Sequence, residues 1–209
     1  MMVTDRRRLG GTDTTLVGVV DAVARAARAG VDLIQVREPG LDDRHLLALT
    51  RQIRDATADT SARILINDRV DVALAADVGG VHLPGRAVAA ARVRAMVPDD
   101  FLVGRSVHSE EEAAAVERDG GCDYLIFGAV YESESKPSGH VPAGVDALKR
   151  VCERVTLPVL AIGGITWARV ADIAKSGAAG IAAIGLFAHT DEAELREALR
   201  GARISFAPR

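Results

Sequence analysis

Eight short apolar runs, each followed by a segment of helical periodicity, constrain the fold of this 209-residue chain more than any other feature. Several runs are continuous and β-branched, as in strands buried on both faces of a parallel sheet. The predicted strands lie at residues 1–4, 31–36, 63–66, 80–83, 102–107, 124–130, 159–162 and 180–184. The intervening apolar spacing predicts helices at 17–29, 41–56, 70–76, 88–96, 110–118, 145–155, 167–176 and 192–202.

Eight strand-helix units in one chain predict an α/β protein with a single-domain (β/α)8 TIM barrel over residues 1–209. The length is near the lower bound of roughly 200 residues for this fold. Glycines such as Gly30 mark the joins between a helix and the next strand, as αβ turns require. An open doubly wound sheet is the alternative, because the number of units does not prove closure.

The composition excludes several classes of partner. A net charge of −3 and a pI of about 6.0 supply no basic field, so neither nucleic acid nor an anionic membrane is an expected partner. Cys122 and Cys152 are far apart and suggest neither a disulfide framework nor a zinc site. No secretory signal and no apolar run of about 20 residues is evident, so we expect a cytoplasmic protein.

In a barrel the active site lies at the carboxyl ends of the strands, so polar residues there are candidates for substrate contact. His108 follows the fifth run, and Ser109 with Glu112 predicts a capped helix directly after it. An imidazole held at such a turn can transfer protons near neutral pH, although a structural histidine bonded to the helix end is the alternative. The predicted substrate-binding residues are Gln35, Arg37, Asn67, Ser106, Ser133 and Lys136.

Glycines end the last two predicted strands, where barrel loops commonly bind phosphate. The predicted phosphate-binding residues are Gly163, Gly164, Ile184 and Gly185, through N–H groups at helix starts. The alternative is that these glycines only permit tight turns. Asp68 likewise has a structural alternative as a cap for the helix that begins at Val70.

Several of these motifs together resemble the thiamine-phosphate synthase and TenI superfamily over nearly the whole chain. The matching segments are Val3-Thr4-Asp5-Arg6, Gln35-Val36-Arg37-Glu38, Ile66-Asn67-Asp68-Arg69, Gly80-Val81-His82-Leu83 and Ala161-Ile162-Gly163-Gly164-Ile165. The resemblance implies one of two activities. Synthases join a pyrimidine diphosphate to a thiazole phosphate, with magnesium held by two aspartates, whereas TenI-like members are metal-independent thiazole tautomerases.

The chain departs from the synthase pattern at two positions. Asp68 matches the first metal aspartate, but the acidic loop expected to hold the second is Pro84-Gly85-Arg86-Ala87 here. Pro39 stands where the synthase has a lysine, although Ser133, Ser135 and Lys136 align with its Thr-x-Thr-Lys loop. The TenI pattern Gly-Arg-Ser-Val-His-Ser falls on residues 104–109.

The sequence therefore favours a thiazole tautomerase, an isomerase of thiamine biosynthesis that acts on a small phosphorylated thiazole with His108 as the proton-transfer residue. No metal is expected in that case. The alternatives are a thiamine-phosphate synthase, which would bind Mg²⁺ through Asp68, and a non-catalytic binding or regulatory barrel. The resemblance also implies a homo-oligomer such as a dimer.

Overall fold

The computed structural model describes residues 1–10, 16–133, 139, 141–188 and 191–207, and it alternates strands and helices along the chain. The strands are β1 (Met2–Val3), β2 (Leu33–Val36), β3 (Arg63–Asn67), β4 (Gly80–Leu83), β5 (Leu102–Val107), β6 (Tyr124–Gly128), β7 (Val159–Ile162) and β8 (Gly180–Ala182). The α-helices are α1 (Val17–Ala29), α2 (Asp43–Ala56), α3 (Val70–Ala75), α4 (Ala90–Arg94), α5 (Glu110–Asp119), α6 (Gly144–Arg154), α7 (Val170–Lys175) and α8 (Glu192–Phe206). Two 3-10 turns, Trp167–Arg169 and Gly185–Phe187, precede α7 and α8.

The strand order follows the chain order, and the pairings are parallel. One helix follows each strand, so the structure confirms the predicted (β/α)8 fold. Two compact units make up the chain: residues 1–82 with 184–200, and residues 83–183 with 201–209. The single-domain assignment stays a prediction.

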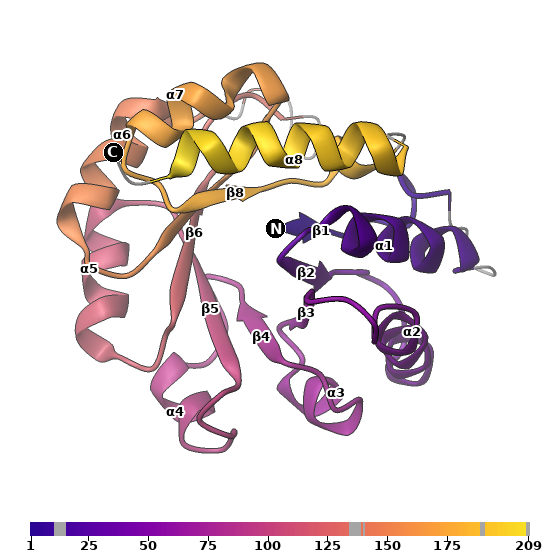
Figure 1. Ribbon diagram of the computed structural model, residues 1–209. Coiled ribbons are helices and arrows are strands. Elements are labelled where there is room, and N and C mark those ends of the chain that lie inside the picture. The colour runs from indigo at the N-terminus through magenta and orange to yellow at the C-terminus, as the bar shows by residue number, and fades with distance from the viewer. Residues whose placement is uncertain (11–15, 134–138, 140, 189–190, 208–209) are drawn as a thin grey trace. The chain divides into compact units, whose positions relative to one another are not determined.

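In the first unit, β1 to β4 pair in order, with Val3 opposite Gln35, Gln35 opposite Leu65, and Asn67 opposite His82. Helices α1 to α3 accompany these strands (Figure 1). The fully buried side chains of this unit include Met2, Ile34, Leu49, Ile53, Leu65 and Ile66. Burial of this continuous aliphatic set stabilises the strands whose carboxyl ends carry the polar residues described below.

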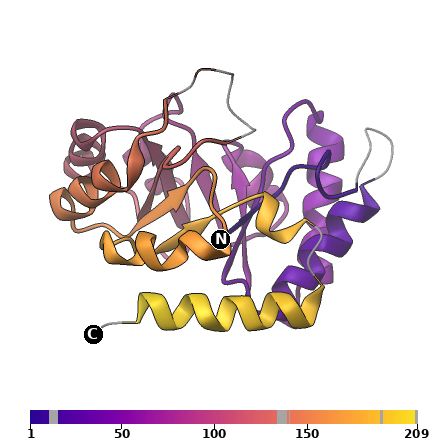
Figure 2. The ribbon, with the colours of Figure 1, turned by 90° about the horizontal axis from the view of Figure 1, so that it is seen from above.

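In the second unit, β5 to β8 pair in order, with Ser106 opposite Ile126 and Phe127 opposite Ala161. The pink and orange helices of this unit lie to one side of its strands (Figure 2). Its fully buried side chains include Val103, Leu125, Phe127, Leu148, Val151 and Ile173. Leu148 and Val151 lie one turn apart on α6, which is the spacing of an apolar helix face packed on a sheet.

The helix ends follow the local chemistry of the sequence. Gly30 adopts a left-handed conformation (φ 103°) and its N–H donates to carbonyls at the end of α1, as the predicted αβ turn requires. The side chain of Ser109 accepts a hydrogen bond from the N–H of Glu112 at 3.1 Å, which confirms the predicted cap of α5. Asp42 caps α2 in the same way through the N–H of His45, so this helix begins at Asp43.

Differences from the predicted boundaries lie at strand ends and at helix ends. β6 ends at Gly128 and β8 at Ala182, two residues before their predicted ends, while α8 continues to Phe206. The backbone beyond β6 still follows β7, because the N–H of Val130 donates to the carbonyl of Ile162 at 2.9 Å. None of the described helices combines the length and apolar character needed to cross a membrane.

Candidate active site

A hydrogen bond between two side-chain amides joins the ends of β2 and β3 in the first unit. The Nε2 atom of Gln35 donates to Oδ1 of Asn67 at 3.0 Å, and Gln35 is buried. The hydroxyl of Thr4, at the end of β1, accepts from the backbone N–H of Arg37 at 3.0 Å. The structure therefore brings together two of the predicted substrate-binding residues, Gln35 and Asn67, and fixes the backbone of a third.

The side chain of Arg37 is exposed, and no side-chain partner is recorded for it among the described residues. The ion-pair partner of Glu38 is Arg6, which no sequence pattern indicated. Arg6 and Glu38 are both buried, with Nη1 of Arg6 at 3.5 Å from Oε2 of Glu38 and the backbone N–H of Arg6 at 3.0 Å from the same oxygen. Because Arg6 offsets the charge of Glu38, the guanidinium of Arg37 is available to a ligand anion.

Asp68 follows β3 in a left-handed conformation, with φ of 65°. Its N–H donates to the carbonyl of His82 at 2.9 Å, and its side chain is exposed. The alternative that Asp68 caps α3 is wrong, because Arg69 occupies the N-cap position and no side chain caps that helix. An aspartate tolerates this backbone conformation better than most residues, and here it directs a carboxylate outward from the end of a strand.

Arg69 holds the start of α3 through two carboxylates. Its guanidinium contacts Asp43 at the start of α2 and donates to Asp71 at 2.6 Å. The hydrogen bond from Arg69 lowers the pKa of the Asp71 carboxyl, which therefore stays ionised near neutral pH. Asp43 and Asp71 are therefore both paired with Arg69. By contrast, no hydrogen bond or ion pair to the carboxylate of Asp68 is recorded within the described residues.

His108 lies between β5 and α5 in the second unit, as predicted. Its Nδ1 is 2.7 Å from the carbonyl oxygen of Gly128, and its backbone N–H donates to Oε2 of Glu112 at 2.7 Å. A carbonyl oxygen only accepts, so Nδ1 carries the hydrogen and Nε2 is the acceptor of the neutral ring. A Cβ atom built on Gly85 would be 3.9 Å from Nε2, so the outer face of the ring adjoins the loop after β4.

Arg105 fixes that loop. Its guanidinium donates to the carbonyl oxygens of Gly85, Ala87 and Val88, at 2.9, 3.2 and 2.7 Å. The three bonds use the fork of guanidinium donors to hold an irregular backbone segment in one conformation. Arg86 lies within this segment and its side chain is exposed.

The turn after β7 contains Gly163 and Gly164, with φ of 100° and 61°. A Cβ on Gly163 would be 2.5 Å from that of Ala129, and a Cβ on Gly164 would be 2.2 Å from the carbonyl oxygen of Glu132. Because the segment after β6 approaches the turn this closely, only glycine fits at either position. Among the described residues no acceptor is recorded for the N–H groups of Gly163 and Gly164, which leaves them available to an anion.

The remaining predicted residues are distributed between the two units. Ile184 and Gly185 belong to the first unit, and Gly185 begins the 3-10 turn before α8. Ser106 and Ser133 belong to the second unit and are half-buried. Lys136 lies outside the described residues, as do Ser135 and His140.

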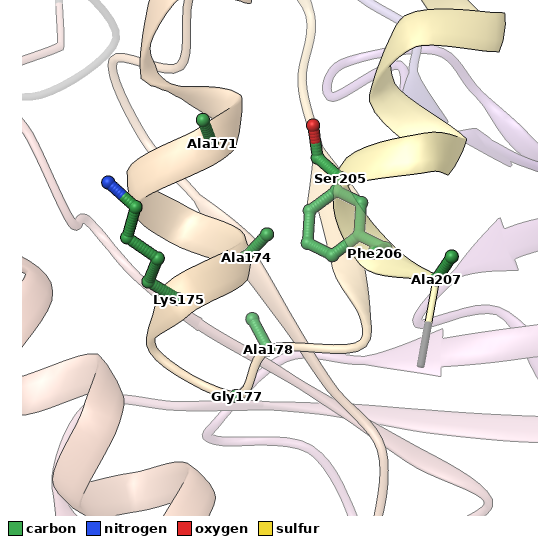
Figure 3. Close-up of a pocket in the computed structure, with 8 residues that line it drawn as sticks. All are labelled: Ala171, Ala174, Lys175, Gly177, Ala178, Ser205, Phe206 and Ala207. Atoms are coloured by element: carbon green, nitrogen blue, oxygen red, sulfur yellow. The ribbon is translucent and has the colours of Figure 1, made fainter. Parts of the chain in front are cut away.

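A cavity of about 530 Å³ opens elsewhere in the second unit, between α7 and the end of α8 (Figure 3). The phenyl ring of Phe206 extends toward Ala174, whereas the side chain of Lys175 points away from it. Gly177 and Ala178 line the cavity directly before β8 begins at Gly180. This cavity lies at the amino end of β8, away from the strand ends that carry the candidate residues.

Sequence patterns did not indicate the contact between Arg169 and Tyr131. The guanidinium carbon of Arg169 is 4.3 Å from the centroid of the Tyr131 ring, and Nη1 donates to the carbonyl of Gly164 at 2.6 Å. These residues are 38 positions apart and belong to no periodic pattern, so only the fold reveals their contact.

Eight βα units in chain order, with polar residues at the strand ends, define an α/β-barrel protein. The comparisons with known proteins identify the family. A family model described as thiamine monophosphate synthase matches residues 1–187. The chain belongs to this family.

The relatives cover nearly the same length. The chain is 40% identical over 199 residues to a putative thiamine-phosphate synthase of Geobacter sulfurreducens, covering 95% of this chain and 91% of the relative. It is 39% identical to the thiamine-phosphate synthase of Methanoculleus marisnigri, covering 88% of this chain and 85% of the relative. The solved thiamine phosphate pyrophosphorylase of Pyrococcus furiosus has a TM-score of 0.84 at 30% identity, covering 99% and 96% of the two chains.

These relatives overturn the prediction of a thiazole tautomerase and with it the isomerase class, because they are named for a synthase, which is a transferase. The structure gives a physical reason for the error. In the segment that favoured the tautomerase, Arg105 holds a loop, Ser109 caps α5 and Nδ1 of His108 bonds to Gly128. Residues that make such structural contacts do not distinguish a tautomerase from a synthase.

Proposed function

We propose that this chain is a thiamine-phosphate synthase of thiamine biosynthesis, which joins a pyrimidine diphosphate to a small phosphorylated thiazole. A bond forms between the thiazole nitrogen and the methylene carbon of the pyrimidine, and the bond from that carbon to diphosphate breaks. Diphosphate leaves with the bonding electron pair, so the reaction needs no oxidant or reductant. The identity of 39% to a thiamine-phosphate synthase over 88% of the chain carries this proposal.

The site residues suit two anionic substrates. The exposed guanidinium of Arg37 is a bidentate donor for phosphate oxygens, and the Gln35–Asn67 pair offers its remaining amide atoms to a polar ring. In this proposal the N–H groups of Gly163 and Gly164 bind the thiazole phosphate, and Ile184 and Gly185 stay predicted phosphate-binding residues. Ser106, Ser133 and Lys136 stay predicted contacts, and His108 in its doubly protonated form would donate a hydrogen bond from Nε2 to a phosphate oxygen of a substrate.

The donor set at Asp68 fits a magnesium ion that is bound mainly through substrate phosphates. The described residues contain no group of three or more His, Cys, Asp or Glu side chains that could hold a metal, and Ala87 offers no second carboxylate. Mg²⁺ typically uses one or two carboxylates together with substrate phosphates and water. Held by Asp68, the ion would supply positive charge against the diphosphate, and Arg37 supplies positive charge from the protein.

The test is to incubate the purified chain with aminopyrimidine diphosphate, thiazole phosphate and Mg²⁺, and to measure thiamine phosphate by mass spectrometry and diphosphate release by a coupled assay. Equal amounts of both products are expected. Diphosphate release without thiamine phosphate, or neither product from folded protein, would overturn the proposal.

A matched pair of variants tests Asp68. Asp77 is also an exposed aspartate with positive φ, but it follows α3 at the opposite end of the unit. We expect Asp68→Asn to lower the rate about 100-fold, in the range of a lost electrostatic contact to the transition state. It should also abolish the effect of Mg²⁺ on inorganic diphosphate affinity, whereas Asp77→Asn leaves both unchanged. A homo-oligomeric state, such as a dimer, and a cytoplasmic location remain predictions from the sequence.

A further inference from the structure

Arg169 connects two segments that are far apart in the sequence, the turn after β7 and the connection after β6. It ends the 3-10 turn Trp167–Arg169. Its Nη1 donates to the carbonyl oxygen of Gly164 at 2.6 Å, and its guanidinium carbon is 4.3 Å from the centroid of the Tyr131 ring. A guanidinium at this distance from an aromatic ring is attracted by the negative face of the ring.

The two segments touch along their backbones as well. The N–H groups of Val130 and Tyr131 donate to the carbonyls of Ile162 and Gly163, at 2.9 and 3.1 Å. No side chain fits at Gly163 or Gly164, since any Cβ there would overlap the segment after β6. A displacement of Tyr131 would therefore be transmitted to the glycine turn.

The contacts of Arg169 are with a main-chain carbonyl and an aromatic ring. No carboxylate is recorded as its ion-pair partner among the described residues, and its hydrogen bond is to a main-chain carbonyl. Donation to the carbonyl of Gly164 polarises the peptide group that this carbonyl shares with the N–H of Ile165. A polarised peptide group is a better hydrogen-bond donor, so this bond favours an anion at the N–H of Ile165. The positive charge of Arg169 also favours an anion at this turn.

We infer that Arg169 is a positioning residue for phosphate binding, which holds the amides of Gly163 and Gly164 in the orientation that receives the phosphate. Tyr131 is its support, because the ring limits the directions in which the guanidinium can point. This inference deepens the proposed function and rests on it for the identity of the phosphorylated substrate. It assigns no contact between Arg169 and the reacting atoms.

The experiment compares four variants and one control variant with the unmodified chain. Arg169→Ala removes both contacts and Arg169→Lys keeps the charge without the planar fork. Tyr131→Leu removes the ring, whereas Tyr131→Phe keeps it. Arg118→Ala is the matched control, because Arg118 is an exposed arginine in the last turn of α5, at the other end of that helix from His108. Titration calorimetry with inorganic phosphate and with thiazole phosphate measures binding directly.

We expect Arg169→Ala to weaken thiazole phosphate binding about tenfold, as for loss of a charge-assisted hydrogen bond. Tyr131→Leu should weaken it about threefold, as for loss of an exposed cation–π contact. Arg169→Lys should restore part of the affinity, and Tyr131→Phe and Arg118→Ala should match the unmodified chain. In steady-state assays the KM for thiazole phosphate should rise in Arg169→Ala while kcat changes less than twofold.

The outcomes separate this inference from the proposed function. Unchanged phosphate and thiazole phosphate affinity in folded Arg169→Ala would overturn the inference even if the chain makes thiamine phosphate. Weakened binding in Arg169→Ala would support it even if the unmodified chain releases no diphosphate. A chain that binds neither probe overturns it too. Thermal unfolding of each variant identifies any loss of binding that comes from loss of the fold.

Discussion

The Nδ1 atom of His108 lies 2.7 Å from the carbonyl oxygen of Gly128, so the end of β5 is tied to the end of β6 through an imidazole ring. The ring is exposed on its other side. One nitrogen therefore has a structural partner and the other is directed to the surroundings of Gly85. The orientation of the outer nitrogen depends on the inner hydrogen bond, as in many sites where histidine acts on a substrate.

Substitutions of His108 should separate these two nitrogens. Asparagine keeps a donor near the position of Nδ1 but has no atom at Nε2. If the doubly protonated ring donates from Nε2 to a substrate phosphate in the transition state, His108→Asn and His108→Ala should both lower kcat about 100-fold. His108→Gln, which can reach the outer position, should retain more activity than either. Full activity of His108→Asn would show that the histidine is structural and would remove it from the mechanism.

The amide pair of Gln35 and Asn67 gives a second prediction. Gln35→Leu removes the donor to Asn67 and leaves Oδ1 of Asn67 without that partner, at a cost of about 1–2 kcal/mol in unfolding free energy. Activity should also fall about tenfold if these amides contact substrate. Urea denaturation and steady-state kinetics measure the two effects. Gln52→Leu, an exposed position on α2, is the control and should change neither.

The double variant Gln35→Leu with Asn67→Leu distinguishes binding from folding. Replacing both partners by apolar residues of similar size removes the unpaired atom, so most of the lost stability should return. Activity should not return, because the polar atoms offered to substrate are absent. Recovery of both together would assign the pair a structural role only.

Much of the fold follows from local chemistry that is visible in the sequence. The apolar runs gave the eight strands, because strands buried on both faces need continuous apolar residues. Ser109 and Gly30 gave helix boundaries, because each satisfies backbone groups within a few positions of itself. The ends of β6 and β8 were less predictable, since apolar residues continue past the last ladder position.

The site was less predictable, because its partnerships join residues distant in sequence. Arg37 is the charged residue adjacent to Glu38, but the cation that pairs with Glu38 is Arg6, 32 positions away. Sequence patterns indicated Gly163 and Gly164, whereas Arg169 and Tyr131, which contact that turn, belonged to no motif. The activity was misassigned because residues 104–109 make structural contacts that a barrel with either activity could use. Their pattern therefore did not identify the reaction.

The Arg6–Glu38 pair is expected to have a large effect on stability. The side chain of Glu38 is fully buried, and its Oε1 has no hydrogen-bond partner within the described residues. Arg6→Ala would leave a buried carboxylate without its cation, which typically costs about 3–5 kcal/mol. Urea denaturation at pH 7 measures this loss. The neighbouring Arg7 is exposed, so Arg7→Ala should change the unfolding free energy by less than about 0.5 kcal/mol.

A paired apolar replacement tests the cause of that loss. Arg6→Met with Glu38→Leu removes both charges at similar volume, and such replacements are often neutral or stabilising. The double variant should therefore be more stable than Arg6→Ala. If it is equally unstable, packing of the arginine side chain rather than an unpaired charge explains the single variant.

Glu117 links α5 to the segment before β7 and gives a pH dependence. Its Oε1 accepts from the N–H and the hydroxyl of Thr156, at 2.6 and 2.8 Å, and from the N–H of Leu157 at 3.0 Å. The side-chain hydrogen bond from Thr156, together with the two backbone bonds, lowers the pKa of the Glu117 carboxyl below its usual value. A lowered folded-state pKa means that the unfolded chain binds this proton more readily.

The stability from ionised Glu117 is therefore present above the unfolded-state pKa of about 4.3 and is lost as the pH falls through the lower folded-state value. Glu117→Gln keeps an acceptor oxygen but removes the charge, so it should lose about 1 kcal/mol at pH 7 and match the unmodified chain more closely below pH 4. Glu153→Gln is the control, because the ion pair recorded for Glu153 within the described part of the chain is an exposed contact of 3.8 Å with Lys149. Urea denaturation of the three proteins at pH 7 and pH 3.5 measures the difference. An equal deficit of Glu117→Gln at both pH values would mean that hydrogen-bond geometry, not the charge of the carboxylate, stabilises this junction.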